Sequence, residues 1–401
     1  MKYPICKKVQ NIKPSGIRKF FDIVSEMKDA ISLGVGEPDF ETPWHIRDEG
    51  IYALEKGKTF YTSNAGLKDL RKEITHYISR TQKINYDPLK EIIVTVGGSE
   101  AIDIGLRAMI NPGDEVIIPQ PSYVSYEPCA VLAGAKPVII NLKAENNFRL
   151  TAQELRNVIT NKTKVLILPY PNNPTGAVYP KEVLEDIIQV ARENDLLIFS
   201  DEIYDRLVMD GVEHYSTAAL APDRMVITMN GLSKSHIVCG FRCGWMCISG
   251  YKGKADDYVE GIFQIAAMRL CGNALTQLVI PAALEDNAST QAMLVPGGRL
   301  YEQREAVIRE IDKIDGLSVV KNHGAFYVFP KLDVKKFNIT NDEQFALDLL
   351  RDKHILVTCG TGFNWKDPDH FRIVYLPKPN EIAQAIRDIG DFLNGYWQKN
   401  D

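Results

Sequence analysis

Four short strings in the middle of the sequence carry side chains suited to covalent and ionic chemistry. They place an amide at Asn173, a carboxylate at Asp201, an amine at Lys234 and a guanidinium at Arg242. A lysine amine condenses with a carbonyl compound when it is neutral part of the time, as happens when it is desolvated or near other cations. A guanidinium presents a fork of donors to a phosphate dianion. The set therefore indicates a Schiff-base site beside a bound phosphate.

Lys234 is the candidate nucleophile because of its neighbours rather than its own type. It stands in the string Asn230-Gly-Leu-Ser-Lys-Ser-His236, and Arg242 follows eight residues later. A lysine taken alone is most often a solvated surface residue. The motifs around Lys234 favour the Schiff-base interpretation.

Asp201 follows the strand-like run Leu196–Ser200, where a carboxylate is costly to bury without a cation. A pyridinium nitrogen would be such a cation, and the carboxylate would keep the ring protonated so that it accepts electrons. The alternative is a helix cap, since aspartate favours caps. Tyr204 and Asn173 could both reach one phenolic oxygen of such a ring, although the string around Asn173 is also typical of an ordinary turn.

A phosphate site is predicted where Gly97-Gly-Ser-Glu100 follows a strand and opens a helix. Helix N-termini bind phosphate through free N–H groups, and glycine lets the backbone come close. The candidate phosphate-binding residues beside Arg242 are Gly98, Ser99, Glu100 and Ser233. The string Gly97–Glu100 would also suit an ordinary strand-to-helix turn. One strand further on, Tyr123 could stack on the ring or be a core tyrosine.

Two further positions suit the carboxylate of an amino acid. Arg372 interrupts an apolar strand in His370-Phe-Arg-Ile-Val-Tyr375, and an inward-facing arginine there needs an anion such as a bidentate carboxylate. The alternative is an arginine that faces outward. Gly36 would let a backbone N–H approach the same ligand.

Composition restricts the class of protein. The chain has 401 residues, 45% hydrophobic and 25% charged, with a net charge of −5, which argues against nucleic-acid or anionic-membrane partners. No run approaches the roughly 18 apolar residues of a membrane span, and no apolar run follows the lysines of the N-terminus, so we expect a cytoplasmic protein. Of seven cysteines, Cys239, Cys243 and Cys247 are spaced by four; a metal site is possible, but one face of a strand suits them better.

Strand and helix patterns alternate through the central part of the chain. The predicted strands are Ile92–Val96, Glu115–Pro119, Pro137–Asn141, Lys164–Pro169, Leu196–Ser200, Met225–Met229 and Cys243–Ser249. The predicted helices are Ser99–Met109, Ser122–Ala133, Thr151–Val158, Lys181–Asn194 and Tyr251–Leu270, after two earlier ones at Trp44–Glu55 and Gly66–Arg80. This order predicts an α/β fold in which helices cover both faces of a mostly parallel sheet and the ligand binds at the carboxyl ends of its strands.

Three segments are expected from these patterns. Residues 1–45 form an N-terminal arm belonging to a small domain, residues 46–290 form the large ligand-binding domain, and residues 291–401 form a smaller α+β domain. A short amphipathic helix is expected from Gly16 in the arm. The small domain is predicted to hold helices at Leu300–Ile311, Asp342–Asp352 and after Pro379, with strands near Leu317–Val320, Ala325–Phe329, Ile355–Val357 and Phe371–Tyr375.

In the order and spacing of these motifs the chain resembles the fold-type-I pyridoxal-phosphate aminotransferases of class I and II, from Ser32-Leu-Gly-Val-Gly-Glu-Pro-Asp-Phe40 to the strand of Arg372. The resemblance implies the cofactor pyridoxal 5'-phosphate. It implies that Lys234 binds the cofactor covalently and moves the proton, that Asp201 pairs with the ring nitrogen, and that Tyr204 and Asn173 bind the ring hydroxyl. Tyr123 would stack on the ring, and Gly98, Ser99, Ser233 and Arg242 would hold the phosphate.

The resemblance also implies an assembly and a reaction. Tyr61 matches a tyrosine that reaches the phosphate of a neighbouring subunit, so a homodimer with shared sites is expected, and Arg372 matches the residue that binds the substrate α-carboxylate. The bacterial alanine-type branch of this family is the one most similar to three segments of the chain, Asn230–Lys234, Met268-Arg-Leu-Cys271 and Asp369–Arg372. The expected activity is a ping-pong exchange of an amino group between amino acids and 2-oxo acids, with the pairs alanine/pyruvate and glutamate/2-oxoglutarate.

Alternatives within and outside that activity stay open at this point. Some prokaryotic aspartate aminotransferases have lysine at the position of Ser99, and serine cannot pair with an acidic substrate side chain. Arg18 in the arm could serve a distal carboxylate instead, or could be solvated. The other interpretations are an aspartate-type or broad-specificity transaminase, a β-lyase acting on the same bound amino acid, and a non-catalytic regulator built on this fold.

Overall fold

The computed structural model describes the chain except residues 1–4, 13–26, 28–29, 39, 286–289 and 400–401. Arg18 and the amphipathic stretch from Gly16 therefore lie outside the described residues. Among the residues that are described, no helix is both long and apolar enough to cross a bilayer.

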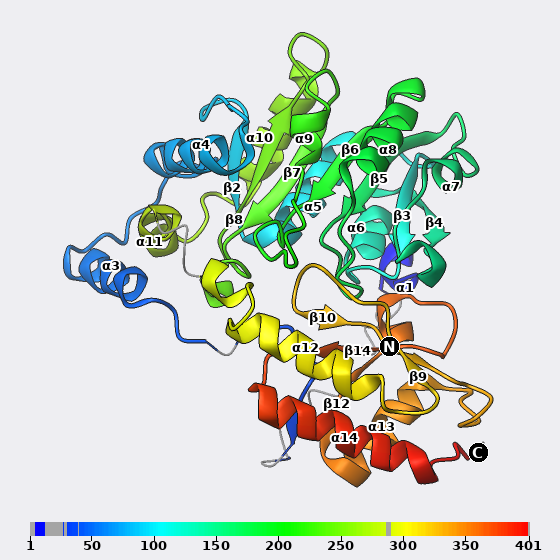
Figure 1. Ribbon diagram of the computed structural model, residues 1–401. Coiled ribbons are helices and arrows are strands. Elements are labelled where there is room, and N and C mark those ends of the chain that lie inside the picture. The colour runs from blue at the N-terminus through cyan, green and yellow to red at the C-terminus, as the bar shows by residue number, and fades with distance from the viewer. Residues whose placement is uncertain (1–4, 13–26, 28–29, 39, 286–289, 400–401) are drawn as a thin grey trace, which may run out of the picture.

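A seven-stranded sheet in the order β2-β8-β7-β6-β5-β3-β4 forms the centre of the larger part of the molecule (Figure 1). Its strands are β2 (Ile92–Thr95), β3 (Glu115–Gln120), β4 (Lys136–Asn141), β5 (Thr163–Pro169), β6 (Leu197–Asp201), β7 (Val226–Gly231) and β8 (Gly244–Ser249). Strands β4, β3, β5, β6 and β7 run parallel to one another, and β8 runs antiparallel between β7 and β2. The predicted mostly parallel sheet is confirmed.

Both faces of this sheet are buried under helices, which is why its strands read as continuous apolar runs. Along β5, Leu166 and Leu168 face a core shared with α8, whereas Val165 and Ile167 face a core shared with α5 and α10. The helices around the sheet are α5 (Gly97–Met109), α6 (Tyr126–Ala133), α7 (Ala152–Arg156), α8 (Lys181–Glu193), α9 (Thr217–Leu220) and α10 (Asp256–Met268). Helices α3 (Trp44–Glu55), α4 (Lys68–Gln82) and α11 (Ala274–Glu285) lie at the β2 side of the sheet, and α1 (Lys7–Gln10) packs near α6.

The C-terminal part has its own apolar core and lies below the large sheet in Figure 1. Its helices are α12 (Arg299–Ile311), α13 (Asp342–Lys353) and α14 (Pro379–Gly395). Its strands are short: β9 (Leu317–Ser318), β10 (Tyr327–Val328), β11 (Lys331–Leu332), β12 (Ile355–Leu356), β13 (Thr358–Cys359) and β14 (Phe371–Val374). The N-terminal strand β1 (Ile31–Ser32) pairs in parallel with β12, so the beginning of the chain packs with its end.

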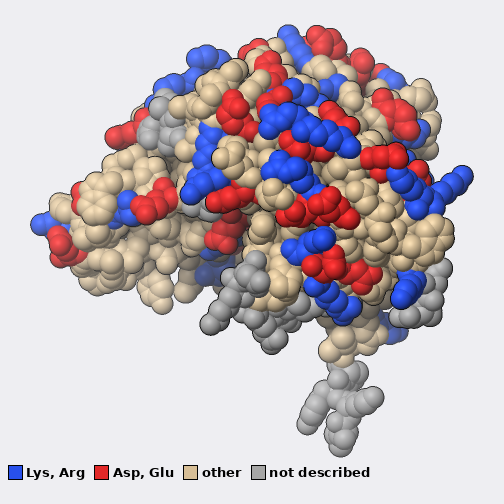
Figure 2. Space-filling view, turned by 60° about the horizontal axis from the view of Figure 1, so that its bottom comes forward, with Lys and Arg blue, Asp and Glu red and all other residues tan. Residues whose placement is uncertain are grey.

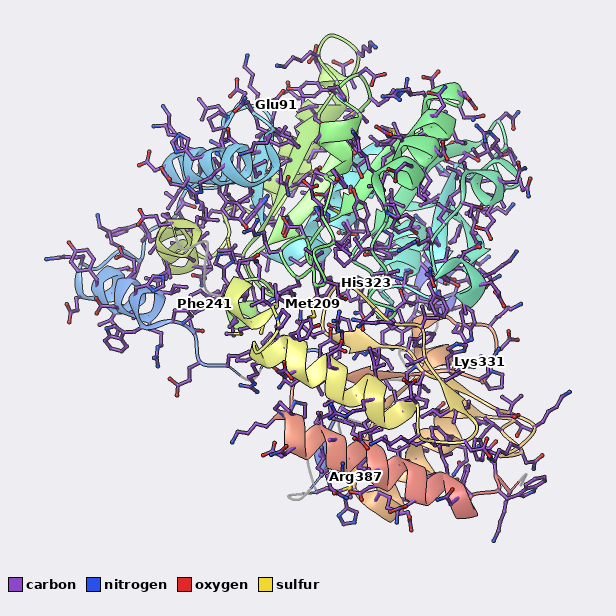
Figure 3. The ribbon with its side chains drawn as sticks, viewed as in Figure 1. Glu91, Met209, Phe241, His323, Lys331 and Arg387 are labelled. Atoms are coloured by element: carbon purple, nitrogen blue, oxygen red, sulfur yellow. The ribbon has the colours of Figure 1, made fainter. Side chains whose placement is uncertain are left out.

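A segment that follows β6 connects the two parts. The backbone N–H of Met209 donates to the carbonyl of His323 over 2.9 Å, and Leu207 and Met209 pack into the C-terminal core. Figure 3 shows Met209 and His323 at the junction between the large sheet and the C-terminal elements. Side chains from both parts can therefore meet in one site.

Candidate active site

A cavity of about 280 Å³ lies at the carboxyl ends of β5, β6 and β7, beside the first turn of α5. The structure brings eleven of the residues singled out in the sequence to its wall: Gly36, Gly98, Ser99, Tyr123, Asn173, Asp201, Tyr204, Ser233, Lys234, Arg242 and Arg372. It adds seven that sequence reasoning missed: Ile102, Tyr126, Pro169, Pro171, Ile203, Cys239 and Tyr327. This convergence places an amine, a carboxylate and two guanidinium groups around one small volume.

Asp201 is the last residue of β6 and is 8% exposed. Burial raises the pKa of its carboxyl group, while hydrogen bonds from the Tyr126 hydroxyl (2.7 Å) and the Ile203 N–H (3.2 Å) oppose that rise. Within the described part of the chain, no lysine, arginine or histidine forms a salt bridge with Asp201. A buried carboxylate at a cavity wall without a cationic partner fits a protonated ring nitrogen of a ligand.

Lys234 follows β7 in a short loop, and its Nζ donates to the carbonyl oxygen of Gly36 over 2.6 Å. The ring of Phe326 lies on another side, with Nζ 5.9 Å from its centroid. These two contacts hold the amine inside the cavity, where it can react with a ligand carbonyl.

The opposite end of the cavity is suited to an anion. Helix α5 begins at Gly97, and its N-cap residue, Val96, has no side chain that caps the first turn. The N–H groups of that turn are therefore suited to a ligand. Arg242 lines the same end, and a Cβ atom built on Gly97 would lie 2.4 Å from its Nη2. With φ at 72°, Gly97 also adopts a conformation that other residues rarely take. Glycine is therefore required for the guanidinium to approach this turn.

Glu100 does not belong to this anion site, in contrast to the expectation. Its carboxylate pairs with Arg269 and accepts a hydrogen bond from the Val96 N–H at 2.6 Å, and it does not line the cavity. The acidic side chain would repel a phosphate, so its withdrawal toward Arg269 leaves the neighbouring turn free for an anion. Ser99 stays at the cavity, with its hydroxyl 3.3 Å from that of Tyr123.

Arg372 enters the cavity from β14 of the C-terminal part. Its Nη1 donates to Asn173 Oδ1 over 2.8 Å and its Nη2 donates to the Gly34 carbonyl, while its Nε is buried and has no hydrogen-bond partner among the described residues. Arg372 as a whole is only 5% exposed and forms no salt bridge with a described carboxylate. A bound carboxylate would supply the missing acceptor and the missing negative charge.

Tyr61, like Glu100, is a predicted site residue that does not line this cavity. It is 84% exposed. The position of Arg18 falls outside the described residues. The three regularly spaced cysteines do not lie together on one strand: Cys239 lines the cavity, Cys243 is buried just before β8, and Cys247 is buried within β8. In the described ranges, no cluster of side chains could hold a metal ion.

Behind Asp201 lies a buried acidic side chain that sequence reasoning did not single out. Glu202 is fully buried, and its Oε1 accepts hydrogen bonds from Ser200 Oγ (2.8 Å), Ser216 Oγ (3.0 Å) and the Thr217 N–H (3.1 Å). Burial raises the pKa of Glu202 to about 8 and lowers that of His214 to about 4. The two side chains face each other with 4.0 Å between Oε2 and Nε2. At neutral pH, Glu202 is therefore protonated beside a neutral histidine.

Replacing this glutamate tests the charge state. A carboxyl group whose pKa is raised in the folded protein stabilises it fully below the unfolded value near 4.5, and that contribution is lost as the pH rises to about 8. Glu202→Gln imitates the protonated form at every pH. The free energy of unfolding of the variant, relative to that of the wild type, should therefore rise by a few kcal/mol between pH 5 and 8, because one pKa unit corresponds to about 1.4 kcal/mol. The difference between the two melting temperatures should rise with it. The exposed control Glu213→Gln should differ from the wild type in melting temperature by the same amount at every pH. The same behaviour in Glu202→Gln would contradict the protonated state assigned to Glu202.

Comparison with known proteins agrees with this geometry. Residues 28–389 match the family described as aminotransferase class I and II. The chain is 42% identical over 371 residues to glutamate-pyruvate aminotransferase AlaA of Haemophilus influenzae, covering 92% of this chain and 91% of that protein. It is 40% identical to an alanine aminotransferase of Mycobacterium tuberculosis, covering 92% and 86% of the two chains.

Solved structures extend the similarity to the fold. An aminotransferase from Escherichia coli superposes with a TM-score of 0.94 at 37% identity and full coverage of both chains. An aspartate aminotransferase from Thermus thermophilus gives 0.87 at 31% identity, covering 97% of this chain and all of that one. The anion site at α5, the carboxylate of Asp201 without a salt-bridge partner and the amine of Lys234 are what a phosphorylated pyridine aldehyde requires. The chain belongs to the class I and II aminotransferases, the transaminases that use pyridoxal 5'-phosphate as cofactor.

Proposed function

We propose that this enzyme transfers the amino group of alanine to 2-oxoglutarate, yielding pyruvate and glutamate, by a ping-pong mechanism. The observation that carries the proposal is the meeting of Lys234, Asp201 and Arg372 in one cavity. The names of the similar proteins from Haemophilus influenzae and Mycobacterium tuberculosis support alanine as the amino donor.

In this proposal Arg372 binds the α-carboxylate of the amino acid. Its unpaired Nε and its buried position make carboxylate binding favourable, because the ligand neutralises an otherwise uncompensated charge. Gly36 brings the backbone to the same place, since its carbonyl already accepts from Lys234. The substrate would thus be fixed with its α-carbon near the lysine amine.

Pyridoxal phosphate, when bound, supplies an aldehyde that takes up amines covalently and a ring that accepts electrons from the substrate α-carbon. Lys234 holds the cofactor until the amino acid arrives; its Nζ then removes the α-proton as general base and returns a proton as general acid. Asp201 keeps a ring nitrogen protonated through its negative charge. The phosphate would be held by Ser99, Ser233, Arg242 and the turn at Gly98. The ring hydroxyl would be bound by Tyr204 and Asn173, and Tyr123 would stack on the ring.

The substrate site is proposed to form between two domains with the predicted boundaries, residues 46–290 and residues 291–401, with residues 1–45 joining the second. Tyr204 and Lys234 come from the loops of the large sheet, whereas Arg372 comes from β14 of the C-terminal core. The parallel pairing of β1 with β12 supports the assignment of the arm. Substrate binding would then draw on both domains at once.

We further propose a homodimer in the cytoplasm. Exposed apolar side chains gather on α3, in the segment after it and at the end of α10: Trp44, Ile51, Tyr52, Leu54, Phe60, Tyr61, Met268 and Leu270. The last two segments adjoin each other, because the Thr62 N–H lies 3.3 Å from Cys271 Sγ. Monomers rarely expose so much apolar surface in one place, so this surface suits a second subunit whose cavity Tyr61 would reach. Seven free cysteines suit a reducing compartment.

The charged surface fits small-molecule substrates rather than a polyanion. On the face shown in Figure 2, lysine and arginine side chains are intermixed with acidic ones and form no extended basic patch. This distribution agrees with the net charge of −5. Amino acids and 2-oxo acids remain the proposed partners, with neither nucleic acid nor membrane.

A donor and acceptor panel tests the substrate assignment. Purified enzyme with cofactor should show its highest kcat/KM for alanine with 2-oxoglutarate, at least about 10-fold above aspartate, since a missing ion pair costs that much discrimination or more. The same preparation should elute with the mass of two chains. In the activity assay, a preference for aspartate would contradict the alanine assignment, and release of ammonia and pyruvate without an acceptor would indicate a lyase. In the size measurement, a mass of one chain would contradict the dimer.

A further inference from the structure

The hydroxyl group of Tyr327 lies in the cavity wall next to the tyrosine proposed to bind the cofactor ring. We propose that Tyr327 is a positioning residue: it donates its hydroxyl hydrogen to the oxygen of Tyr204, so that Tyr204 in turn donates to the phenolic oxygen of the cofactor. This inference rests on the proposed function and adds a residue to it. It assigns a role to a side chain that the sequence analysis did not single out.

The contact between the two tyrosines is short and buried. Their hydroxyl oxygens are 2.7 Å apart, their rings meet edge to face at 5.6 Å between centroids, and the side chains are 6% and 1% exposed. Tyr204 follows β6 of the large sheet, whereas Tyr327 lies on β10, opposite Val374 of β14. The hydrogen bond therefore joins the segment that follows the large sheet to a strand of the C-terminal part, within one apolar core.

Three contacts fix where the Tyr327 hydroxyl points. A Cβ atom on Gly36 would lie 2.4 Å from this oxygen, so the glycine makes room for the hydroxyl. The guanidinium of Arg372 lies 4.7 Å from the centroid of the Tyr327 ring and packs against its face. Phe326 borders the ring on a further side at 4.7 Å. The ring is held so tightly that its oxygen can hardly leave Tyr204.

The direction of the hydrogen bond follows from what the cofactor can accept. Only one hydrogen can lie between the two hydroxyl oxygens, and an anionic phenolic oxygen has no hydrogen to give. Tyr204 must therefore turn its own hydrogen toward the cofactor, which leaves its oxygen as the acceptor for Tyr327. Burial and the neighbouring Tyr327 raise the pKa of Tyr204 well above its usual value, so Tyr204 keeps the hydrogen it donates.

A chain of two hydrogen bonds is stronger than its separate members. Each bond polarises the next, by roughly 10–30% in condensed phases. The Tyr327 hydroxyl should therefore strengthen the donation by Tyr204 and stabilise negative charge on the phenolic oxygen. With the cofactor bound, that charge would be least compensated when the nitrogen joining Lys234 to the cofactor has lost its proton. The relay would therefore lower the pKa of that nitrogen.

Titration of the visible absorption band of the cofactor-loaded enzyme, without substrate, tests the relay. Tyr204→Phe should raise the midpoint pH because the phenolic oxygen loses its donor. Tyr327→Phe should raise it by about one tenth to one third of that shift. The double variant should match Tyr204→Phe alone, since Tyr327 acts only through Tyr204. Tyr375→Phe is the matched control: its buried hydroxyl donates to the Ala325 carbonyl away from the cavity, and its midpoint should equal that of the wild type.

Two results would overturn the inference. One is a Tyr327→Phe midpoint equal to that of the wild type and of Tyr375→Phe. The other is a double variant whose shift is the sum of the two single shifts, which would mean that Tyr327 acts independently of Tyr204. Failure of the proposed function looks different: the wild type would then show no titrating visible band, or Tyr204→Phe would leave its midpoint unchanged.

Discussion

Lys234→Ala should slow the half-reaction with alanine by a factor of at least about 10⁴. General acid–base catalysis alone is worth about 10² to 10⁴, and the covalent step requires the same amine. Lys234 is the one lysine that lines the cavity within the described residues, so another lysine side chain in that wall cannot replace it. Rapid mixing of cofactor-loaded enzyme with alanine, followed by the change in visible absorbance, measures the effect.

The control for this change is Lys254→Ala, an exposed lysine beyond the end of β8. Its half-reaction should proceed at the wild-type rate, with the same cofactor content. If Lys234→Ala kept turnover within about 10-fold of the wild type, the amine would be neither the attachment point nor the proton carrier. A variant that had lost its fold would be recognised by a lower melting temperature than that of the control.

Asp201→Asn should lower kcat by about 10³ and weaken cofactor binding. Losing one preorganised electrostatic group from an enclosed site typically costs about 10² to 10³ in kcat, and here the ring would also lose the proton that makes it an electron acceptor. Asparagine keeps the shape and can still accept from the Tyr126 hydroxyl, which lies 2.7 Å from the carboxylate. The change therefore removes mainly charge. Steady-state kinetics and equilibrium dialysis of the cofactor measure both effects.

Tyr126→Phe serves as the comparison for that variant, because it removes the hydrogen bond and leaves the charge. Its kcat should fall far less than that of Asp201→Asn. If Asp201→Asn turned over within about 10-fold of the wild type, or if both variants lost the same activity, the carboxylate would have a structural role at the end of β6 instead.

The parts of the fold that sequence reasoning anticipated are those that local patterns specify. Strands buried on both faces, such as Thr163–Pro169 and Leu197–Asp201, contain nearly continuous apolar runs, and site residues fall at their ends or directly after them. The C-terminal part was harder to predict because several of its strands have two residues each and depend on packing, as with β11 and β13. Nothing in local sequence distinguishes such pairs from loops.

Side-chain pairs far apart in the chain account for the other differences. Glu100 looked like part of the phosphate turn, but Arg269 binds its carboxylate, and 169 residues separate the two. Tyr126 and Tyr327 lie in apolar surroundings that are typical of core tyrosines, and only the fold shows that their hydroxyls meet Asp201 and Tyr204. The roles of the site residues follow from this geometry and stay predictions until variants are measured.

Chemical trapping tests the central claim most directly. Borohydride reduction of the cofactor-loaded enzyme, followed by proteolysis and mass spectrometry, should place one pyridoxyl group on the peptide that contains Lys234. The visible band should disappear at the same time. Pyridoxyl on a different lysine, or cofactor that washes away unreduced from a folded protein, would contradict the account.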